Sequence, residues 1–329
     1  MISSLFASIS ADETLPVSPP SDDFWMPTSA STFASDVDGL YDFLFWISAI
    51  SAAGIFLAML LFVVKYRAKS REANETVEES SQHNTALEIT WSVIPLFFCI
   101  AIFVWGFKGY VEMRTPPKDT VEIHVQGQKW NWIFTYPTGK VDSKLHVPVD
   151  KDVRVIIQSV DVLHSLFIPA FRTKMDAVPG RYTDLWFRAT KTGKYPIFCA
   201  EYCGTSHSDM LSEAIVYEPG GYEQWVNKID VPSDPKVWGE QLYTQRGCKT
   251  CHSIDGTSLV GPTWKGLFGA QRKFVDGTSA TADENYISTS INNPAGQVVQ
   301  GYPPSMPSYQ GQLSDQEINA IIEYIKSLK

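Results

Sequence analysis

The sequence predicts a multidomain protein with a two-helix transmembrane hairpin, an all-β sandwich and an all-α C-terminal domain. Three observations predict it. Two long apolar segments lie in the first third, short runs of alternating hydrophobicity fill the middle, and a C-x-x-C-H motif precedes a helical pattern near the end. With 329 residues the chain exceeds one typical domain. We predict five parts: an outer N-terminal segment (1–39), the hairpin (40–110), the β domain (111–218), a short helix with a linker (219–235) and the helical domain (236–329).

The composition narrows the class of protein. The formal net charge is -9, which argues against a nucleic-acid partner. The 5 cysteines form two close pairs and a singleton. This spacing is unlike a disulfide framework and favours two metal or cofactor sites. Cys99 lies inside an apolar segment, where we interpret it as a small apolar filler.

Both apolar segments are long enough to cross a bilayer, which takes about 20 residues. The first, Leu40–Val64, carries no charge after Asp42. The second, Ile89–Phe107, is uncharged and has Trp91 and Trp105 near its ends, as interfacial anchors should be. The protein is therefore expected to lie in a lipid bilayer.

Basic residues predict the orientation of the hairpin. No Lys or Arg precedes Lys65, and Arg67, Lys69 and Arg71 follow at once. The loop between the helices is therefore predicted to be cytoplasmic, with both termini and the rest of the chain outside. Residues 1–12 lack a basic region and have only a short apolar stretch, which argues against a signal peptide. Cleavage of a signal peptide remains an alternative. The Ser-, Pro- and Asp-rich stretch 11–38 is expected to be poorly ordered.

Glu88 stands at the cytoplasmic end of the second apolar segment. It is either a solvated carboxylate favoured by the helix dipole or a carboxylate through which protons enter a partner subunit.

From Val121 to Tyr217 the pattern is typical of a β-sandwich of roughly 100 residues. Near its end, two thiols, an imidazole and a thioether fall within twelve residues, with a further histidine upstream. These residues are His164, Cys199, Cys203, His207 and Met210. Such soft donors favour copper, and two cysteines on one loop can bridge two copper ions. A Cys199–Cys203 disulfide or a structural zinc site are the alternatives; Met210 argues against zinc.

Residues 40–218 strongly resemble subunit II of heme-copper cytochrome c oxidases. The resemblance implies a cupredoxin-like domain that carries the binuclear copper centre CuA. The implied copper ligands are His164, Cys199, Glu201 through its main-chain carbonyl, Cys203, His207 and Met210.

The same resemblance implies further roles. The Glu201 side chain would help to bind Mg at the boundary with subunit I. Trp130 would belong to the aromatic patch through which electrons enter CuA, and Glu88 would mark the entrance of a proton path into subunit I. Relatives that oxidise quinol lack the two cysteines of this loop, so their presence favours a cytochrome-type donor.

Cys248-Lys-Thr-Cys251-His252 is the attachment motif for c-type heme. The residues around it resemble the class I cytochrome c fold over 236–329. The resemblance implies that His252 and Met306 bind the heme iron, while the Pro262 carbonyl orients the imidazole. Gly239 and Tyr243 would pack against Ile321 and Tyr324 where the first and last helices cross. The helix from Ser314 is predicted to begin with a capping box that includes Glu317.

Together these features predict subunit II of a proton-pumping terminal oxidase with a covalently bound heme c. An external donor would reduce heme c, which would reduce CuA, and electrons would pass to subunit I for reduction of dioxygen to water. Expected partners are subunit I, subunit III and a donor that is a cytochrome c, another small redox protein or a quinol-oxidising complex. The expected location is the bacterial plasma membrane, with both redox domains on the periplasmic side. A membrane-anchored electron shuttle and a copper-delivery protein are the rival functions.

Overall fold

A computed structural model describes residues 21, 24–67, 83–228 and 231–329 of the chain. The predictions about a signal peptide at 1–12 and about Lys69 and Arg71 concern residues outside these ranges. The chain divides into two compact units. One unit is the helical hairpin of residues 33–115, and the other joins residues 1–32 to residues 116–329.

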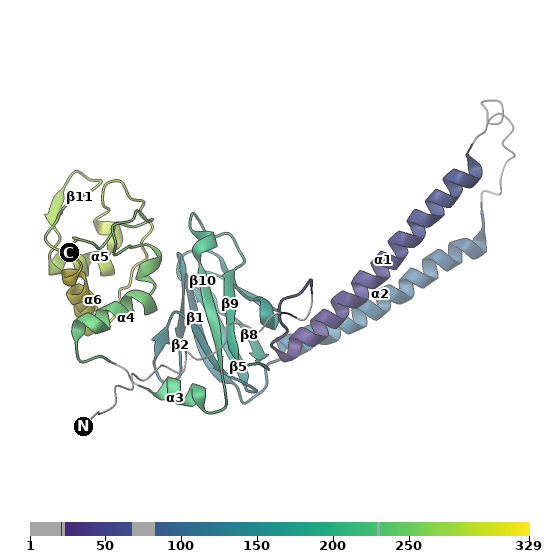
Figure 1. The fold of residues 1–329 in the computed structure, drawn as a ribbon, viewed down its shortest axis with the longest axis horizontal. Coiled ribbons are helices and arrows are strands. Elements are labelled where there is room, and N and C mark those ends of the chain that lie inside the picture. Colours follow the sequence, from purple (N-terminus) through teal and green to yellow (C-terminus); the bar gives the residue numbers. More distant parts are fainter. Residues whose placement is uncertain (1–20, 22–23, 68–82, 229–230) are drawn as a thin grey trace, which may run out of the picture. The chain divides into compact units, whose positions relative to one another are not determined.

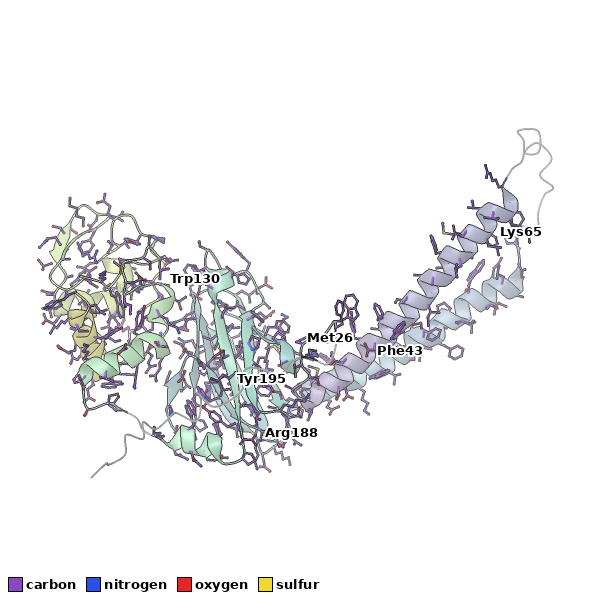
Figure 2. The ribbon with its side chains drawn as sticks, in the orientation of Figure 1. Met26, Phe43, Lys65, Trp130, Arg188 and Tyr195 are labelled. Atoms are coloured by element: carbon purple, nitrogen blue, oxygen red, sulfur yellow. The ribbon has the colours of Figure 1, made fainter. Side chains whose placement is uncertain are left out.

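The hairpin consists of α1 (Thr32–Tyr66) and α2 (Thr85–Arg114), which run side by side in Figure 1. Both helices are long and apolar enough to cross a membrane. Aromatic rings pack between them: the Phe43 ring centroid lies 6.4 Å from that of Phe98 and 5.9 Å from that of Trp105. Figure 2 labels Phe43 and Lys65 on α1. The helix begins before the predicted Leu40, because adding residues to a formed helix costs little.

Two five-stranded sheets form the β domain, in the orders β3-β2-β1-β5-β8 and β4-β10-β9-β6-β7. β5 shows the expected alternation, with every second side chain buried. The pairs β1–β5 and β4–β10 are parallel, so both sheets are mixed. The strands are β1 (Val121–Gln128), β2 (Asn131–Thr135), β3 (Val141–Asp142), β4 (Leu145–Pro148), β5 (Asp152–Ser159), β6 (His164–Ile168), β7 (Thr173–Ala177), β8 (Thr183–Arg188), β9 (Gly193–Cys199) and β10 (Leu211–Tyr217).

The two residues before α1 are ordered against this sandwich and residues 32–38 form the start of α1, which corrects the expectation that residues 30–38 are poorly ordered. The Ala30 amide donates to the Ala170 carbonyl, and the Thr190 amide donates to the Ala30 carbonyl, both at 2.9 Å. Ser31 forms a β-bridge with Ala189. Composition alone could not show this, because these backbone bonds do not depend on the side chains that make the segment look polar.

After the last strand, the short helix α3 (Gly221–Asn227) packs on the sandwich, as the sequence predicts. The His146 ring stacks on the Trp225 ring with a centroid separation of 3.7 Å. The Lys140 ammonium lies over the Trp225 ring, 4.1 Å from its centroid. The start of the linker is thus fixed to the β domain.

The C-terminal domain is mainly helical, with α4 (Pro235–Gln245), α5 (Glu284–Asn292) and α6 (Asp315–Ser327). The capping box of Ser314 and Glu317 is present. Gly239 lies where α4 crosses α6, and a Cβ there would collide with the Ala320 carbonyl and approach Tyr324 Cβ. Smaller elements are the hairpin β11 (Gln271–Lys273) with β12 (Ser279–Thr281) and the 3-10 turns η2 (Pro169–Phe171), η3 (His207–Asp209), η4 (Cys248–Thr250) and η5 (Pro294–Gly296).

Candidate functional site

The soft donors predicted to bind copper come together at one end of the β domain. His164 begins β6 and Cys199 ends β9, whereas Cys203, His207 and Met210 lie on the segment that joins β9 to β10. The Cys199 and Cys203 sulfurs are 3.8 Å apart, so both cysteines are free thiols. His164, Cys199 and Cys203 are all buried, and their donor atoms lie within 4.8 Å of one another.

Each sulfur has its own neighbours in this cluster. Cys199 Sγ is 3.9 Å from His164 Nδ1 and 3.3 Å from the Glu201 carbonyl oxygen. Cys203 Sγ is 3.4 Å from His207 Nδ1 and 3.9 Å from Met210 Sδ. The six predicted donors therefore form one continuous set. Two thiols flanked by two imidazoles, a thioether and a carbonyl fit a pair of soft copper ions.

The two thiols differ in acidity. Burial opposes ionisation of Cys199, but His164 and nearby backbone groups lower its pKa to about 7. Burial and the neighbouring Cys199 charge raise the pKa of Cys203 to about 12. Two adjacent buried thiolates need a compensating positive charge, which a bound metal supplies.

Asp161 is a candidate positioning residue that the sequence reasoning did not single out. Its carboxylate lies 2.8 Å from His164 Nε2 and accepts the Lys129 amide at 2.8 Å. A carboxylate on the far ring nitrogen fixes the tautomer that leaves Nδ1 free for a metal. The available signal was an acidic side chain three residues before the histidine.

Trp130 lies directly against the segment that joins β9 to β10, here called the copper loop. Its indole Nε1–H donates to the Cys203 carbonyl at 3.2 Å, and its ring would contact any Cβ added to Gly204. The side chain is only 4% exposed. The Glu201 side chain is exposed, in contrast to its carbonyl, which faces Cys199.

The C-x-x-C-H segment follows α4 and begins with η4. His252 is 9% exposed, and its Nδ1 lies 2.7 Å from the Pro262 carbonyl oxygen, as predicted for an oriented imidazole. Burial lowers the pKa of His252, which keeps the ring neutral. With Nδ1–H donating to Pro262, Nε2 retains a free lone pair that can bind a metal.

The residues around His252 fit a heme. Met306 lines the same cavity as Cys251 and His252, although more than fifty residues separate them in sequence. Gly261 provides the room for the imidazole, since an added Cβ would lie 2.7 Å from His252 Cε1. The Gln297 side-chain oxygen is buried at this cavity without a hydrogen-bond partner within the described residues. A polar cofactor group at the cavity would satisfy it.

Glu88 lies in the first turn of α2. Its Oε1 accepts the backbone amide of the N-cap residue Asn84 at 3.3 Å and lies 3.6 Å from His83 Nδ1. The carboxylate is 43% exposed. This geometry suits the helix-capping interpretation and leaves the carboxylate accessible.

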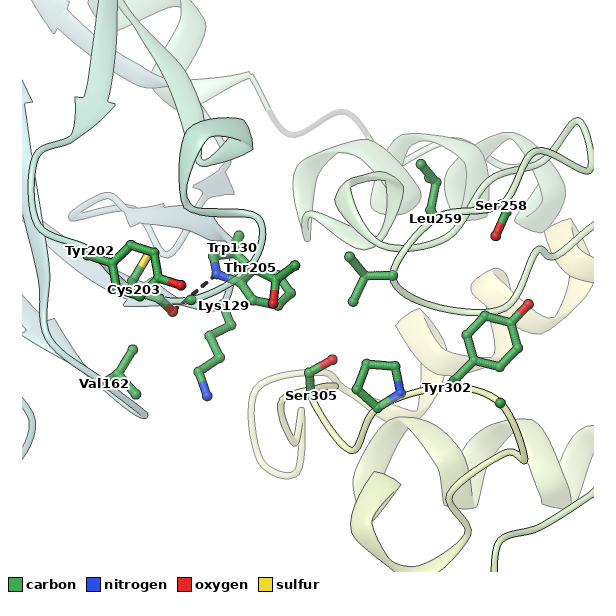
Figure 3. Close-up of a pocket in the computed structure, with 14 residues that line it drawn as sticks. Lys129, Trp130, Val162, Tyr202, Cys203, Thr205, Ser258, Leu259, Tyr302 and Ser305 are labelled. Carbon is green, nitrogen blue, oxygen red and sulfur yellow. Dashed lines mark hydrogen bonds between the residues drawn. The ribbon is translucent and has the colours of Figure 1, made fainter.

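A cavity of about 740 Å³ lies between residues 202–205, which include Cys203, and two loops of the heme domain, residues 258–260 and 301–305. Figure 3 shows Trp130, Tyr202 and Cys203 on one side and Leu259, Tyr302 and Ser305 on the other. The two candidate sites therefore face a common space.

Three family models match the chain. The cytochrome c oxidase subunit II transmembrane domain matches residues 19–108, the periplasmic domain of the same subunit matches residues 138–216, and cytochrome c matches residues 237–329. The periplasmic domain implies the copper centre CuA, and the cytochrome c domain implies heme c. These matches cover the three regions described above.

Relatives give the same result. Cytochrome c oxidase subunit 2 of Alkalihalophilus pseudofirmus is 30% identical over 86% of this chain and 84% of its own length. The alternative cytochrome c oxidase subunit 2 of Bradyrhizobium diazoefficiens is 30% identical over 62% of this chain and 84% of its own. Among solved structures, the periplasmic domain of subunit II from Bradyrhizobium japonicum is 35% identical, covering 34% of this chain and 94% of that one, with a TM-score of 0.33.

The matches establish a membrane-anchored component of an oxidoreductase complex, associated with other oxidase subunits. The fold class predicted from the sequence is confirmed: two apolar helices, a β-sandwich and a helical cytochrome c domain. The chain belongs to the cytochrome c oxidase subunit II family and carries a fused cytochrome c domain.

Proposed function

We propose that this subunit accepts electrons from an external donor at its heme c and passes them through CuA to subunit I, where dioxygen is reduced to water. The observation that carries the proposal is the cluster of soft donors on the β9–β10 segment, in which the Cys199 and Cys203 sulfurs lie 3.8 Å apart. When bound, both cofactors supply one-electron redox chemistry. The protein supplies their ligands and the contact between their domains.

At the copper centre the proposed ligands are the six donors predicted from the sequence: His164, Cys199, the Glu201 carbonyl, Cys203, His207 and Met210. Their present separations support this role, because every donor lies within 4 Å of one of the two sulfurs. Asp161 would hold the His164 ring in the binding orientation. A rigid, preassembled site favours electron transfer, since few atoms must move when the charge changes.

At the heme, Cys248 and Cys251 would form the thioether links, and His252 and Met306 would bind the iron. Support comes from the Pro262 contact of His252 and from the shared cavity with Met306. Trp130 would carry electrons toward the copper, because its indole donates to the carbonyl of the copper-binding Cys203.

Two further roles extend the proposal. The exposed Glu201 side chain would help to bind Mg at the boundary with subunit I; loss of bound Mg in Glu201→Gln oxidase would support this, and unchanged Mg content would refute it. Glu88 would begin a proton path in support of pumping, so Glu88→Gln should slow proton uptake during reduction of the enzyme. Normal uptake would leave Glu88 as a helix cap.

The proposed location is the bacterial plasma membrane, with two spanning helices and both redox domains on the periplasmic side. The basic residues Lys65 and Arg67 at the end of α1 support this orientation. A reagent that labels periplasmic thiols or lysines only should modify the redox domains and spare Lys65. Subunit III is a further proposed partner, as is a donor of the cytochrome c, small redox protein or quinol-oxidising type.

Purification tests the proposal against its rival, a membrane-anchored electron shuttle. The chain should co-purify with a large polytopic heme subunit, contain copper and iron, and support oxygen consumption. A chain that carries both metals but purifies without such a subunit would favour the shuttle. Copper-free protein with Cys199 joined to Cys203 would overturn the copper site itself.

A further inference from the structure

Three side-chain hydrogen bonds join the copper domain to the heme domain. They run from Gln126 Nε2 to Gln312 Oε1 (3.0 Å), from Gln128 Nε2 to the Tyr309 hydroxyl (3.1 Å) and from Asn131 Nδ2 to the Arg246 carbonyl (3.2 Å). The donors lie at the end of β1 and the start of β2, on both sides of Trp130.

Tyr309 is the central residue of this contact. Its hydroxyl accepts from Gln128 and donates to the Arg246 carbonyl at 2.9 Å, so both its hydrogen-bonding functions are used. Gln128 is fully buried and Tyr309 is 6% exposed. Hydrogen bonds between groups buried this deeply are costly to break, because each group loses its partner without gaining water.

The contact fixes the backbone just before the heme attachment motif. Arg246 ends α4, two residues before Cys248. Its side chain is held by Glu317 at 2.5 Å, and both side chains are largely buried. Gly247 completes the fit, since a Cβ at this position would collide with the Asn131 side chain.

Trp130 then lies between the two cofactor-binding segments. Its indole donates to the Cys203 carbonyl on the copper loop. Its backbone lies beside the Cys251 thiol, and its side chain lines a cavity together with Val260 and Ser305 of the heme domain. One residue therefore contacts both the heme-attachment segment and the copper-binding segment.

We propose that Gln128 and Tyr309 are positioning residues that hold the heme domain closed on Trp130, so that Cys251 and Cys203 stay in contact with the same residue. This inference rests on the proposed transfer from heme c to CuA. Neither side chain touches a cofactor-binding residue through its own polar group. They act by keeping the two domains in the one arrangement that brings Trp130 between them.

The test uses the purified oxidase with Tyr309→Phe, Gln128→Leu and the double variant. Tyr309→Phe removes the hydroxyl but keeps the ring that packs in the heme domain. Gln128→Leu removes the same Gln128–Tyr309 hydrogen bond from the side of the copper domain. Tyr182→Phe, at a side chain that is 68% exposed, is the matched control. Amide hydrogen exchange in peptides covering residues 123–133 and 245–252 measures opening of the contact, and pulsed reduction of the heme followed by copper absorbance measures transfer.

Gln128→Leu should speed exchange in these peptides by about tenfold, the change expected for losing one well-buried hydrogen bond. Tyr309→Phe also loses the bond to the Arg246 carbonyl and should speed exchange by at least as much. The double variant should add little, because both changes remove the same bond. Transfer from heme to copper should slow in all three, with unchanged spectra at both sites, while Tyr182→Phe should match the wild type.

Exchange at wild-type rates in both single variants would overturn the proposal, as would faster exchange with no change in transfer. Failure of the proposed function has a different signature. In that case, reduction of the heme in the wild-type oxidase would not be followed by reduction of copper.

Discussion

The residues proposed to bind copper and those proposed to bind heme are held by different kinds of structure. Two of the proposed copper donors, His164 and Cys199, lie at the ends of the adjacent strands β6 and β9 of one sheet, and the others lie on the segment that joins β9 to β10. The heme ligands come from loops, and His252 and Met306 share a cavity that the surrounding helices leave open. The proposed copper site is therefore anchored to a paired sheet, whereas the heme domain has a cavity beside His252 that a cofactor would fill.

This difference predicts how the stability of each domain responds to substitutions. A sheet that folds through its own core should survive the loss of a metal ligand, because β10, β9 and β6 remain paired. A domain that surrounds its cofactor should be more sensitive to changes that alter packing near it. The predictions below test the contrast, from the largest expected effect to the smallest.

Cys199→Ser should abolish the near-infrared absorption of mixed-valence copper, because serine cannot replace a bridging thiolate. The Cys199 and Cys203 sulfurs lie 3.8 Å apart, close enough to share metal ions. The c-heme spectrum should be unchanged, since the heme ligands lie in a separate domain. Absorption and metal analysis of the purified oxidase measure both. Persistence of the copper band would contradict the bridging role.

Met306→His should lower the reduction potential of the c heme, because replacing a thioether ligand by an imidazole removes the ligand that raises it. Met306 lines the same cavity as His252. Potentiometric titration of the heme absorbance measures the shift, and the copper potential serves as the internal control. An unchanged heme potential would show that another residue binds the iron.

Gly239→Ala should destabilise the heme domain by about 3 kcal/mol, the upper end of the usual range for overpacking. The added Cβ would collide with the Ala320 carbonyl, and a backbone atom in α6 cannot move aside as a flexible side chain can. Calorimetry of the intact oxidase should show earlier unfolding of the heme domain alone. Gly109→Ala is the matched control, since its Cβ would meet nothing within 4 Å. Equal unfolding temperatures in both variants would contradict the tight helix crossing.

Sequence reasoning located the features that depend on local patterns. The copper donors on the β9–β10 segment follow from their own spacing, as do Cys248, Cys251 and His252. The capping box of α6 is equally local, because Ser314 and Glu317 contact each other three residues apart. Such features need no knowledge of which distant segments meet.

The features that were missed depend on contacts between distant segments. The backbone of Ala30 pairs with residues 170 and 190, and no side-chain pattern in residues 11–38 indicates it. Gln128 and Tyr309 are 181 residues apart in sequence, and each alone looks like an ordinary polar residue. The β11–β12 hairpin is local and was missed for a different reason: with three residues in each strand, it is too short to give a clear alternation.

The smallest expected effect concerns His146, which is buried in the copper domain far from the metal ligands in sequence. Its Nδ1 contacts the Tyr217 hydroxyl at 2.8 Å, and its Nε2 has no hydrogen-bond partner among the described residues. Burial lowers the pKa of His146 well below 6.5, and Lys140 and Lys144 act in the same direction. Asp142, the facing acidic group at 3.7 Å, has a pKa raised by its own burial and so compensates less.

Because the folded protein holds His146 neutral, the unfolded chain binds one more proton once the pH falls below about 6.5. Stability of the copper domain should therefore decrease by up to about 1.4 kcal/mol for each pH unit below that value. His146→Gln should remove this part of the slope. Calorimetry of the intact oxidase between about pH 7 and about pH 5 can measure the change. His124→Gln, at a histidine that is 58% exposed, should keep the wild-type slope. If both variants kept the wild-type slope, protonation of His146 would not explain the loss of stability in acid. The stability of the sheet that carries the proposed copper ligands would then not depend on this buried ring.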